Sequence, residues 1–334
     1  AYLIRIGSER RDYFMGKILA VDGGGSKLRM LLFDDDFKLL GQGLSGGVNV
    51  TQTTPENSRA NVADCLGQVF KGERSVNLDR IYVVFVGPVN ILYEGLEKYA
   101  TVKEVVELGE AKAGMLAGIM EKEGILALSG TGCDVFYVRE EESLNILLGG
   151  WGPILGDQGS GTWIGEEAIK AAVKYVEGWG KPTKIFSLIE RDWKLEYPRQ
   201  MIQIVHGAVA PFRVVASLTH IVGEAARAGD EVALEILAEA GELMAQQADC
   251  LIRREGIPDR YWKVACCGGA WKTHPKMFDT FRRRLEELYP NIQVYKPWFE
   301  HILAGLVNEM LLRGIPVEQG KQLIQEKFPD YVIN

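Results

Sequence analysis

The first third of the chain alternates short apolar segments with turns, and then with helical patterns. Short apolar runs bounded by glycine or charged residues are typical of β-strands, whereas apolar positions three and four apart are typical of helices. The run Ile-Tyr-Val-Val-Phe-Val within 80–86 is apolar throughout, which indicates a strand buried on both faces. We therefore predict strands at 17–21, 29–33, 38–43, 80–86 and 103–108 and helices at 54–71, 90–100 and 110–121.

At Gly124 the pattern begins again, with another series of short apolar segments separated by turns. A strand, a glycine turn and a second strand thus occur twice, at 17–33 and at 125–138, which indicates an approximate internal duplication. The order of elements predicts an α/β fold of two like domains, each a sheet covered by helices. The remaining predictions are strands at 125–128, 133–138, 145–148, 263–267 and 292–295 and helices near 162–177, 183–191, 208–228, 231–255, 275–289, 299–312 and 316–327.

The length of 334 residues is too great for one ordinary core and predicts two domains of about 100–200 residues each. We place an N-terminal domain at 15–123 and a C-terminal domain at 124–334, with the last helix free to pack back on the first domain. Residues 1–14 contain several charged side chains and no continuous apolar stretch, so they do not resemble a signal peptide. We interpret them as an extension outside the fold.

The amino-acid composition, above all the glycine content, indicates a ligand-binding site. Glycine, at 38 residues, is well above its usual ~7% and gathers in short clusters, as expected where backbone lines a ligand. The net charge of −7 argues against a nucleic-acid or anionic-membrane surface. No apolar run approaches the ~20 residues of a membrane span, and the five cysteines form no C-x-x-C pair. We expect a cytoplasmic protein with a small-molecule substrate, no nucleic acid and no membrane.

The first glycine turn reads Asp-Gly-Gly-Gly-Ser-Lys over 22–27. Three glycines let a ligand approach the backbone, and consecutive N–H groups can cradle an anion. Asp22 could hold a hydrated Mg²⁺ beside phosphates. The turn is not a P-loop, because a strand follows it, and a glycine hairpin without a ligand is the plain alternative. The predicted phosphate-binding residues here are Gly23, Gly24, Gly25, Ser26 and Lys27.

Two further glycine turns, at 129–132 and 268–269, also follow short apolar strands. In an α/β sheet, ligands lie beyond the strand ends. Two facing hairpins could hold successive phosphates, and a third glycine pair would let a flat ring lie against the backbone. Together the turns predict a nucleoside triphosphate held between the two domains, with contacts from Gly130, Thr131, Gly132, Gly268 and Gly269.

The stretch 149–165 contains seven glycines, two tryptophans and the carboxylate of Asp157. Aromatic rings beside an acid and exposed backbone suit a sugar, which offers apolar faces and hydroxyl edges. A turn followed by a helix N-terminus is the plain alternative. We interpret Asp157 as a functional residue and Trp163 as part of the core.

These motifs resemble the N-acetylglucosamine kinase branch of the actin/hexokinase/Hsp70 superfamily, which also holds the BadF-like ATPases. The matching segments are 22–27, 129–132, 149–165 and 268–271, and the resemblance spans about residues 17–313. It implies two ribonuclease-H-like, actin-like ATPase domains with a ligand cleft between them. It also implies MgATP as phosphate donor and a hexosamine hydroxyl, usually at C6, as acceptor.

The resemblance assigns roles position by position. It implies that Asp22 acts on Mg²⁺ through water, and that Asn49, in the loop after the third strand, contacts the sugar. Trp151 and Asp157 fall where the family contacts the sugar, and Asp134 lies near the same pocket. Because asparagine also favours turns, an ordinary turn residue is the alternative for Asn49.

The chain departs from the family at the catalytic base. Relatives have an Asp at the head of the helix after the fifth strand, whereas this chain has Glu110 there. A carboxylate at a helix N-terminus is stabilised by the dipole, and Glu can accept a proton from a hydroxyl. Its extra methylene matters, since a ~1 Å misplacement can lower a rate ~10²-fold. A helix-capping acid is the alternative for Glu110. Gln158 and Asp134 also differ from the family, which leaves the acceptor open beyond N-acetylglucosamine.

We expect an ATP-dependent kinase that phosphorylates an amino sugar: N-acetylglucosamine, glucosamine or a related hexosamine. One alternative is a BadF-like ATPase that activates a radical dehydratase. Such relatives hold an iron–sulfur cluster with cysteines at a dimer interface, whereas Cys266 and Cys267 lie in a predicted buried strand, where thiols act as small apolar groups. The other alternative, suggested by Glu110, is a nucleotide or sugar sensor without turnover. The sequence leaves a homodimer open.

Overall fold

The computed structural model describes residues 16–25, 27–50, 53–139 and 146–333. Predicted Ser26 and the extension at 1–14 lie outside these residues. The chain divides into two compact units, one of Ala1–Leu108 with Gln322–Pro329 and the other of Gly109–Lys321 with Asp330–Asn334. Among the described residues, no helix is both long and apolar enough to cross a bilayer.

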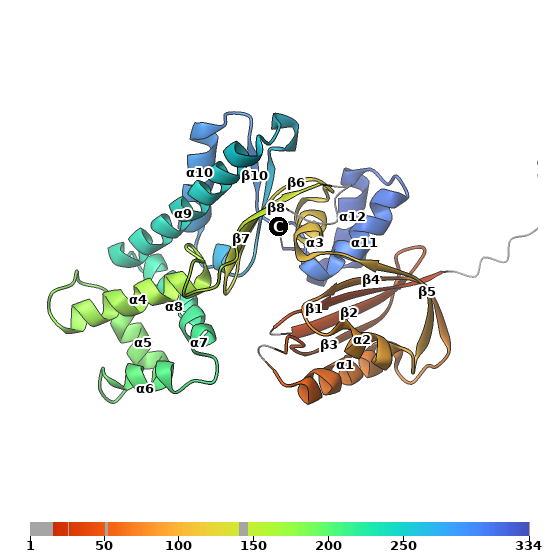
Figure 1. The fold of residues 1–334 in the computed structure, drawn as a ribbon, viewed down its shortest axis with the longest axis horizontal. Coiled ribbons are helices and arrows are strands. Elements are labelled where there is room, and N and C mark those ends of the chain that lie inside the picture. Colours follow the sequence, from red (N-terminus) through yellow and green to blue (C-terminus); the bar gives the residue numbers. More distant parts are fainter. Residues whose placement is uncertain (1–15, 26, 51–52, 140–145, 334) are drawn as a thin grey trace, which may run out of the picture. The chain divides into compact units, whose positions relative to one another are not determined.

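The first unit contains a five-stranded sheet in the order β3-β2-β1-β4-β5 (Figure 1). β1 pairs with β2 in antiparallel fashion and with β4 in parallel fashion, so the central strand is the first in the chain. Leu19 and Val21 of β1 are fully enclosed in the core. The strands are β1 Lys17–Gly23, β2 Lys27–Asp34, β3 Leu39–Gly46, β4 Val76–Phe85 and β5 Ala100–Glu107.

Two helices cover this sheet, α1 Pro55–Phe70 and α2 Val89–Leu96 (Figure 1). α1 begins where the Thr54 side chain accepts a hydrogen bond from the Asn57 amide, 3.2 Å away, and Pro55 presets the first turn. α2 is shorter than the helix predicted at 90–100. Ala100 instead begins β5 and pairs with Val76, so strand pairing overrides local helix propensity there.

The second unit repeats the same sheet. Its strand order is β10-β9-β6-β7-β8, with β6 at the centre, antiparallel to β7 and parallel to β9. This matches the first sheet strand for strand, and it confirms both the predicted duplication and the predicted α/β class. The strands are β6 Gly124–Ser129, β7 Cys133–Val138, β8 Ile146–Gly149, β9 Lys263–Cys267 and β10 Gln293–Tyr295.

Helices cover both faces of the second sheet (Figure 1). The larger core contains buried residues of β6, β7 and β9 together with the apolar sides of α4, α8, α9 and α10. On the other face, Ala111, Met115 and Ile119 of α3 pack on Leu126 and Ala265. The helices of this unit are α3 Glu110–Ile119, α4 Gly161–Val176, α8 Thr219–Arg227, α9 Glu231–Glu255, α10 Pro275–Leu288 and α11 Ala304–Leu312. The helix α12 Val317–Lys327 begins in this unit and continues into the segment Gln322–Pro329 of the first unit.

Between α4 and α8 the chain forms three short helices, α5 Ile185–Trp193, α6 Gln200–His206 and α7 Pro211–Ser217. The helix predicted at 208–228 is therefore two helices, α7 and α8. Side chains compete with the backbone at their junction: Ser217 donates to the Val214 carbonyl, and Thr219 donates to the Ala216 carbonyl. α6 has no counterpart among the predicted elements.

Candidate active site

The first glycine turn joins β1 to β2. The Gly24 amide donates to the Lys27 carbonyl at 3.0 Å, and the Val48 amide donates to the Gly24 carbonyl at 2.9 Å. Gly23 is packed, because a Cβ there would lie 2.6 Å from the Phe85 ring, whereas a Cβ on Gly24 would meet nothing within 4 Å. The turn thus has a fixed base and an open tip that a ligand can approach.

The polar residues predicted in the first unit lie at the same end of β1. Asp22 is half-buried and stands opposite Arg29 across the hairpin. Asn49 is also half-buried, and it follows Val48, the residue bonded to Gly24. Asp22 offers hard carboxylate oxygens, and Mg²⁺ characteristically keeps several waters and binds one or two carboxylates plus substrate phosphates. The residue type therefore fits contact with the hydrated ion of an MgATP substrate.

The second glycine turn joins β6 to β7 and is bound to the start of α4. The Gly161 amide donates to the Gly130 carbonyl at 2.7 Å, and the Thr162 hydroxyl donates to the Thr131 carbonyl at 2.7 Å. A Cβ on Gly130 would meet nothing, and Thr131 is exposed. The turn is therefore rigidly supported from below, open at its tip, and next to the positive end of a helix dipole.

The third glycine turn lies against the second. Gly268 has φ +112°, and a Cβ there would stand 2.1 Å from the Ser129 carbonyl oxygen. Because β6 and β9 are adjacent parallel strands, with Leu128 opposite Cys267, their carboxyl ends meet at this point. Gly269 again faces open space. The structure therefore brings the predicted phosphate turn at 130–132 and the predicted adenosine turn at 268–269 together.

Asp157 lies directly beside the second turn. It is 7% exposed, has φ +57°, and accepts a hydrogen bond from the Gly152 amide at 3.2 Å. A Cβ on Gly132 would lie 2.7 Å from its Oδ2, so glycine is required there for the carboxylate to approach. Burial raises the pKa of Asp157, and the backbone hydrogen bonds oppose that effect.

Asp134 is the second carboxylate at this turn. A Cβ on Gly150, which has φ +70°, would lie 2.2 Å from its Oδ1. Burial raises the pKa of Asp134 to about 6, and the negative charges of Asp157 and Glu110 add to the effect. The three carboxylates therefore share one electrostatic environment in the second unit.

Glu110 is the first residue of α3 and is exposed. Its N-cap, Gly109, has no side chain, and the His301 Nε2 atom lies 3.3 Å from the Glu110 carbonyl oxygen. Trp151, on the loop after β8, is 71% exposed. The second unit thus gathers seven predicted residues around one end of its sheet, and Asp22, Asn49 and the first turn belong to the other unit. The gathered residues are Glu110, Gly130, Thr131, Gly132, Asp134, Asp157 and Gly268.

Two residues that support the site were absent from the prediction. Thr162 holds the Thr131 carbonyl, and the Gln247 amide donates to the Gln158 carbonyl at 2.8 Å from α9. Thr162 has a sequence signal, since it stands at a helix start just beyond a glycine cluster. Gln247 has none, because it lies 89 residues from its partner in a regular helical stretch.

The cysteines are free thiols, and Cys65, Cys133, Cys266 and Cys267 are buried. Burial raises the pKa of Cys133, and of Cys267, to about 12, so these thiols stay protonated and pack as small apolar groups. Among the described residues, no three His, Cys, Asp or Glu side chains are arranged to hold a metal ion.

The fold and its glycine turns define a class. Two duplicated five-stranded sheets with the order 3-2-1-4-5, each with a glycine hairpin at the end of its central strand, constitute the actin-like ATPase fold. Within this class, the sequence profile of the BadF/BadG/BcrA/BcrD ATPase family matches residues 19–306. The chain belongs to that family.

Two characterised relatives cover most of the chain. It is 27% identical over 288 residues to an N-acetylmuramic acid/N-acetylglucosamine kinase of Clostridium acetobutylicum, covering 84% of this chain and 94% of the relative. It is 23% identical over 302 residues to an N-acetyl-D-glucosamine kinase of Dictyostelium discoideum, covering 85% of this chain and 93% of the relative.

Solved structures share the fold. A proposed N-acetylglucosamine kinase from Chromobacterium violaceum matches with a TM-score of 0.65 at 19% identity, over 88% of this chain and 99% of that one. A glucokinase of the ROK family from Streptomyces griseus, solved with glucose and AMPPNP, matches with a TM-score of 0.56 at 17% identity, over 89% and 99%. At these identities the likeness concerns the fold alone.

Proposed function

We propose that the protein is an ATP-dependent kinase that phosphorylates a hydroxyl of an amino sugar. The acceptor is N-acetylglucosamine, glucosamine or a related hexosamine, and the hydroxyl is the one at C6. Membership of an ATPase family and two relatives that are amino-sugar kinases along most of their length support this proposal.

The observation that carries the proposal is the grouping at the carboxyl end of the second sheet. An open phosphate-type turn at 130–132, the turn at 268–269 and the carboxylates of Asp134 and Asp157 occur together there. A nucleotide needs backbone that it can approach closely, and a polyhydroxylated acceptor needs hydrogen-bond acceptors, so these two kinds of surface are needed side by side.

Glu110 is the proposed catalytic base. It would accept the proton of the sugar hydroxyl as the oxygen attacks the γ-phosphorus of ATP in line, the bond to the β-phosphate oxygen breaks, and ADP leaves. It lies in the first turn of α3, at the positive end of the helix dipole, where a negatively charged side chain is favoured. Exposed Glu110 can reach a bound acceptor without rearrangement of the core.

The nucleotide is held from both hairpins in this proposal. The open tips of the glycine turns at 23–25 and 130–132 and the Thr131 hydroxyl would bind the β- and γ-phosphates, and Gly268 and Gly269 would lie against the adenosine. Asp22 would contact the hydrated Mg²⁺ of the MgATP substrate. Positive N–H dipoles aimed at the transferring group stabilise the charge that spreads over its oxygens.

Asn49, Trp151, Asp134 and Asp157 are the proposed sugar contacts. The 71% exposed ring of Trp151 can stack on an apolar sugar face, and carboxylate oxygens can accept hydrogen bonds from hydroxyls. The carboxylates of Asp134 and Asp157 would repel an anionic acceptor bound beside them. They therefore favour an acceptor that is neutral or positively charged.

The deciding experiment measures ADP release with MgATP across glucosamine, N-acetylglucosamine, N-acetylmuramic acid and glucose, with NMR identification of the phosphorylated carbon. Sugar-dependent release with an amino sugar and phosphate on C6 is the expected result. Release that is independent of sugar would indicate an ATPase of the activator type, and ATP binding without release would indicate a sensor. Either outcome contradicts the kinase proposal.

A further inference from the structure

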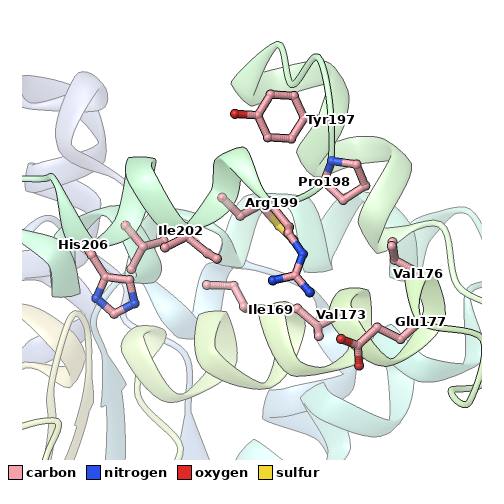
Figure 2. Close-up of a pocket in the computed structure, with 11 residues that line it drawn as sticks. Ile169, Val173, Val176, Glu177, Tyr197, Pro198, Arg199, Ile202 and His206 are labelled. Atoms are coloured by element: carbon pink, nitrogen blue, oxygen red, sulfur yellow. The ribbon is translucent and has the colours of Figure 1, made fainter.

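Two hollows of the second unit have nearly the same volume and differ in chemistry. The first is an apolar groove of about 610 Å³ between α4 and α6, with Ile169 and Val173 on one wall and Met201 and Ile202 on the other (Figure 2). The second is a cavity of about 580 Å³ that is lined by two arginines, two glutamates and two tyrosines. Because charged groups dominate the second cavity, its lining indicates which ligand chemistry fits it.

This polar cavity lies at the end of the second sheet opposite to the glycine turns. Glu123, which lines it, directly precedes β6, whereas the second turn begins after Ser129, where β6 ends. The strand rises roughly 17 Å between its two ends, so the cavity is separate from the candidate active site. Its volume is in the range of small-molecule sites. The charged and aromatic residues that line it are Glu123, Tyr137, Arg139, Glu255, Arg260 and Tyr261.

The two arginines of the cavity lie against its two tyrosines. The Arg139 Cζ atom is 5.2 Å from the centroid of the Tyr137 ring, and the Arg260 Cζ atom is 4.5 Å from the centroid of the Tyr261 ring. The two rings also contact each other, with centroids 5.8 Å apart and 59° between their planes. Stacking restricts each guanidinium group, so it loses less conformational entropy when it binds an anion.

Tyr137 supplies a neutral hydroxyl to the same cavity. Its side chain is 5% exposed, and burial together with the neighbouring Tyr261 raises the pKa of Tyr137 above its ordinary value. The phenol therefore stays protonated at neutral pH and keeps an O–H group that can donate a hydrogen bond. The cavity thus combines guanidinium donors with a phenol donor, and both kinds of group bind the oxygens of an anion.

Positive charge predominates at the cavity. Arg254, which is outside the lining, donates from Nε to Glu255 Oε1 at 2.6 Å and offsets that carboxylate. Three guanidinium groups therefore stand beside the two carboxylates of Glu123 and Glu255. Guanidinium groups match the geometry of phosphate and bind it through paired hydrogen bonds. A carboxylate in the same cavity favours a ligand that also carries a positive charge.

We propose that this cavity binds an amino-sugar phosphate, with the phosphate at the guanidinium groups of Arg139 and Arg260 and the ammonium group at Glu123. A phosphate monoester carries about −1.5 to −2 charges at pH 7, which matches two guanidinium groups better than one carboxylate does. The phosphate and the ammonium group follow from the cavity. The choice of a sugar to join them rests on the proposed function, because an amino-sugar kinase makes such a compound.

Isothermal titration calorimetry of the full chain without nucleotide tests the proposal. The probes are glucosamine 6-phosphate, glucose 6-phosphate, N-acetylglucosamine 6-phosphate and inorganic phosphate. Glucosamine 6-phosphate should bind with a dissociation constant below about 1 mM. The two sugar phosphates without an ammonium group should bind about 5-fold more weakly, as expected for the loss of one ion pair, and inorganic phosphate should bind more weakly still.

Arg260→Gln removes one guanidinium group and should weaken the binding of glucosamine 6-phosphate about 10-fold or more. Arg74→Gln is the matched control, because Arg74 stacks on the Tyr99 ring at the same 4.5 Å in the first unit and does not line the cavity. It should leave binding unchanged. Thermal unfolding checks that the variants are folded. Arg139→Lys, which keeps the charge and loses the planar fork, is the second variant and should also weaken binding.

Glu123→Gln tests the ammonium contact. It should bring the affinities for glucosamine 6-phosphate and glucose 6-phosphate to within about 2-fold of each other, whatever its effect on both. Asp157→Asn separates the cavity from the proposed acceptor site. If the sugar phosphate also binds at the acceptor site as a reaction product, Asp157→Asn should remove that second binding event, and Arg260→Gln should keep it.

No binding of any probe at about 1 mM would overturn the proposal. Binding that both Arg260→Gln and Arg139→Lys leave unchanged would overturn it too, because the ligand would then occupy another site. Equal affinity of the wild-type chain for glucosamine 6-phosphate and glucose 6-phosphate would contradict the assignment of an amino sugar. None of these results bears on the kinase proposal, which is judged by sugar-dependent ADP release.

Discussion

The two glycine hairpins share a backbone plan but differ in charge. In the first, Gly23 pairs with Leu28 and Asp22 with Arg29, and in the second, Ser129 pairs with Cys133 and Leu128 with Asp134. The position held by Arg29 in one hairpin is therefore held by the acid Asp134 in the other. Duplication preserved the turn and its open tip, whereas the flanking charges diverged.

The hairpins also differ in support. Among the described residues, the amides of Val48 and Val86 donate to the Gly24 and Gly23 carbonyls of the first turn, whereas the start of α4, Gly268 and Asp157 all pack against the second. A turn buttressed on several sides can position an acceptor and a base closely, and a turn with fewer contacts can adjust to a flexible polyphosphate. Under the proposed function, this difference fits acid–base chemistry at the second hairpin and metal-assisted phosphate binding at the first.

The largest expected effect, on kcat, tests the proposed acid–base chemistry near the second hairpin. Glu110→Gln keeps the shape of the side chain and removes its ability to accept a proton. We expect kcat to fall about 10²–10⁴-fold, the usual contribution of a general base. ATP affinity, measured by calorimetry, should change little. Glu190→Gln, at an exposed glutamate on α5, serves as the control, and unimpaired turnover of Glu110→Gln would exclude Glu110 as the base.

The next effect tests the first hairpin. Asp22→Asn removes the charge proposed to act on the Mg²⁺ of MgATP, and metal assistance is worth several kcal/mol. We expect kcat/KM to fall about 10²–10³-fold, with a higher Mg²⁺ concentration needed for half-maximal rate. Asp36→Asn, at an exposed aspartate in the turn between β2 and β3, should behave as wild type. An unchanged Mg²⁺ dependence in Asp22→Asn would refute the proposed role.

Local patterns were enough to predict both hairpins, because each is a short apolar strand, a glycine turn and another strand in continuous sequence. The contacts that turn the second hairpin into a site are not local. Gly268 contacts Ser129 because β6 and β9 pair. Gln247 donates to Gln158 from α9, and the apolar pattern of α9 predicts only which of its residues are buried, not what its polar residues contact. The groove beside α6 also escaped prediction, since that seven-residue helix has too few turns for a periodic pattern.

A third effect tests the support of the second hairpin. Gly268→Ala would place a Cβ 2.1 Å from a backbone oxygen at φ +112°, and backbone cannot yield cheaply there. We expect the free energy of unfolding to fall by about 2–4 kcal/mol in urea denaturation. Gly269→Ala, the adjacent residue with open space and φ −70°, should change stability by less than about 1 kcal/mol. Equal losses in the two variants would mean that Gly268 does not buttress the turn.

The smallest effect concerns the charge that distinguishes the second hairpin from the first. The pKa of Asp134 is raised from its ordinary 3.8 to about 6, first by burial and then by Asp157 and Glu110. Between these pH values the folded state binds more protons than the unfolded state, so stability falls as the pH rises through this window. Two pK units correspond to about 2.7 kcal/mol, and partial exposure of the carboxylate reduces the expected penalty to about 1–2 kcal/mol.

Asp134→Asn should therefore raise the free energy of unfolding by about 1–2 kcal/mol at pH 7.5 and by clearly less at pH 4.5, where the native Asp134 is largely protonated and only the unfolded chain has begun to lose the proton. Asp249→Asn is the control of opposite sign, because hydrogen bonds from Arg253 lower the pKa of Asp249 and its ionised form is the stabilising one. That substitution should destabilise the protein at pH 7.5. If Asp134→Asn instead destabilised the chain equally at both pH values, its carboxylate would serve as a packed hydrogen-bonding group, and the contrast between an acidic and a basic hairpin would lose its energetic basis.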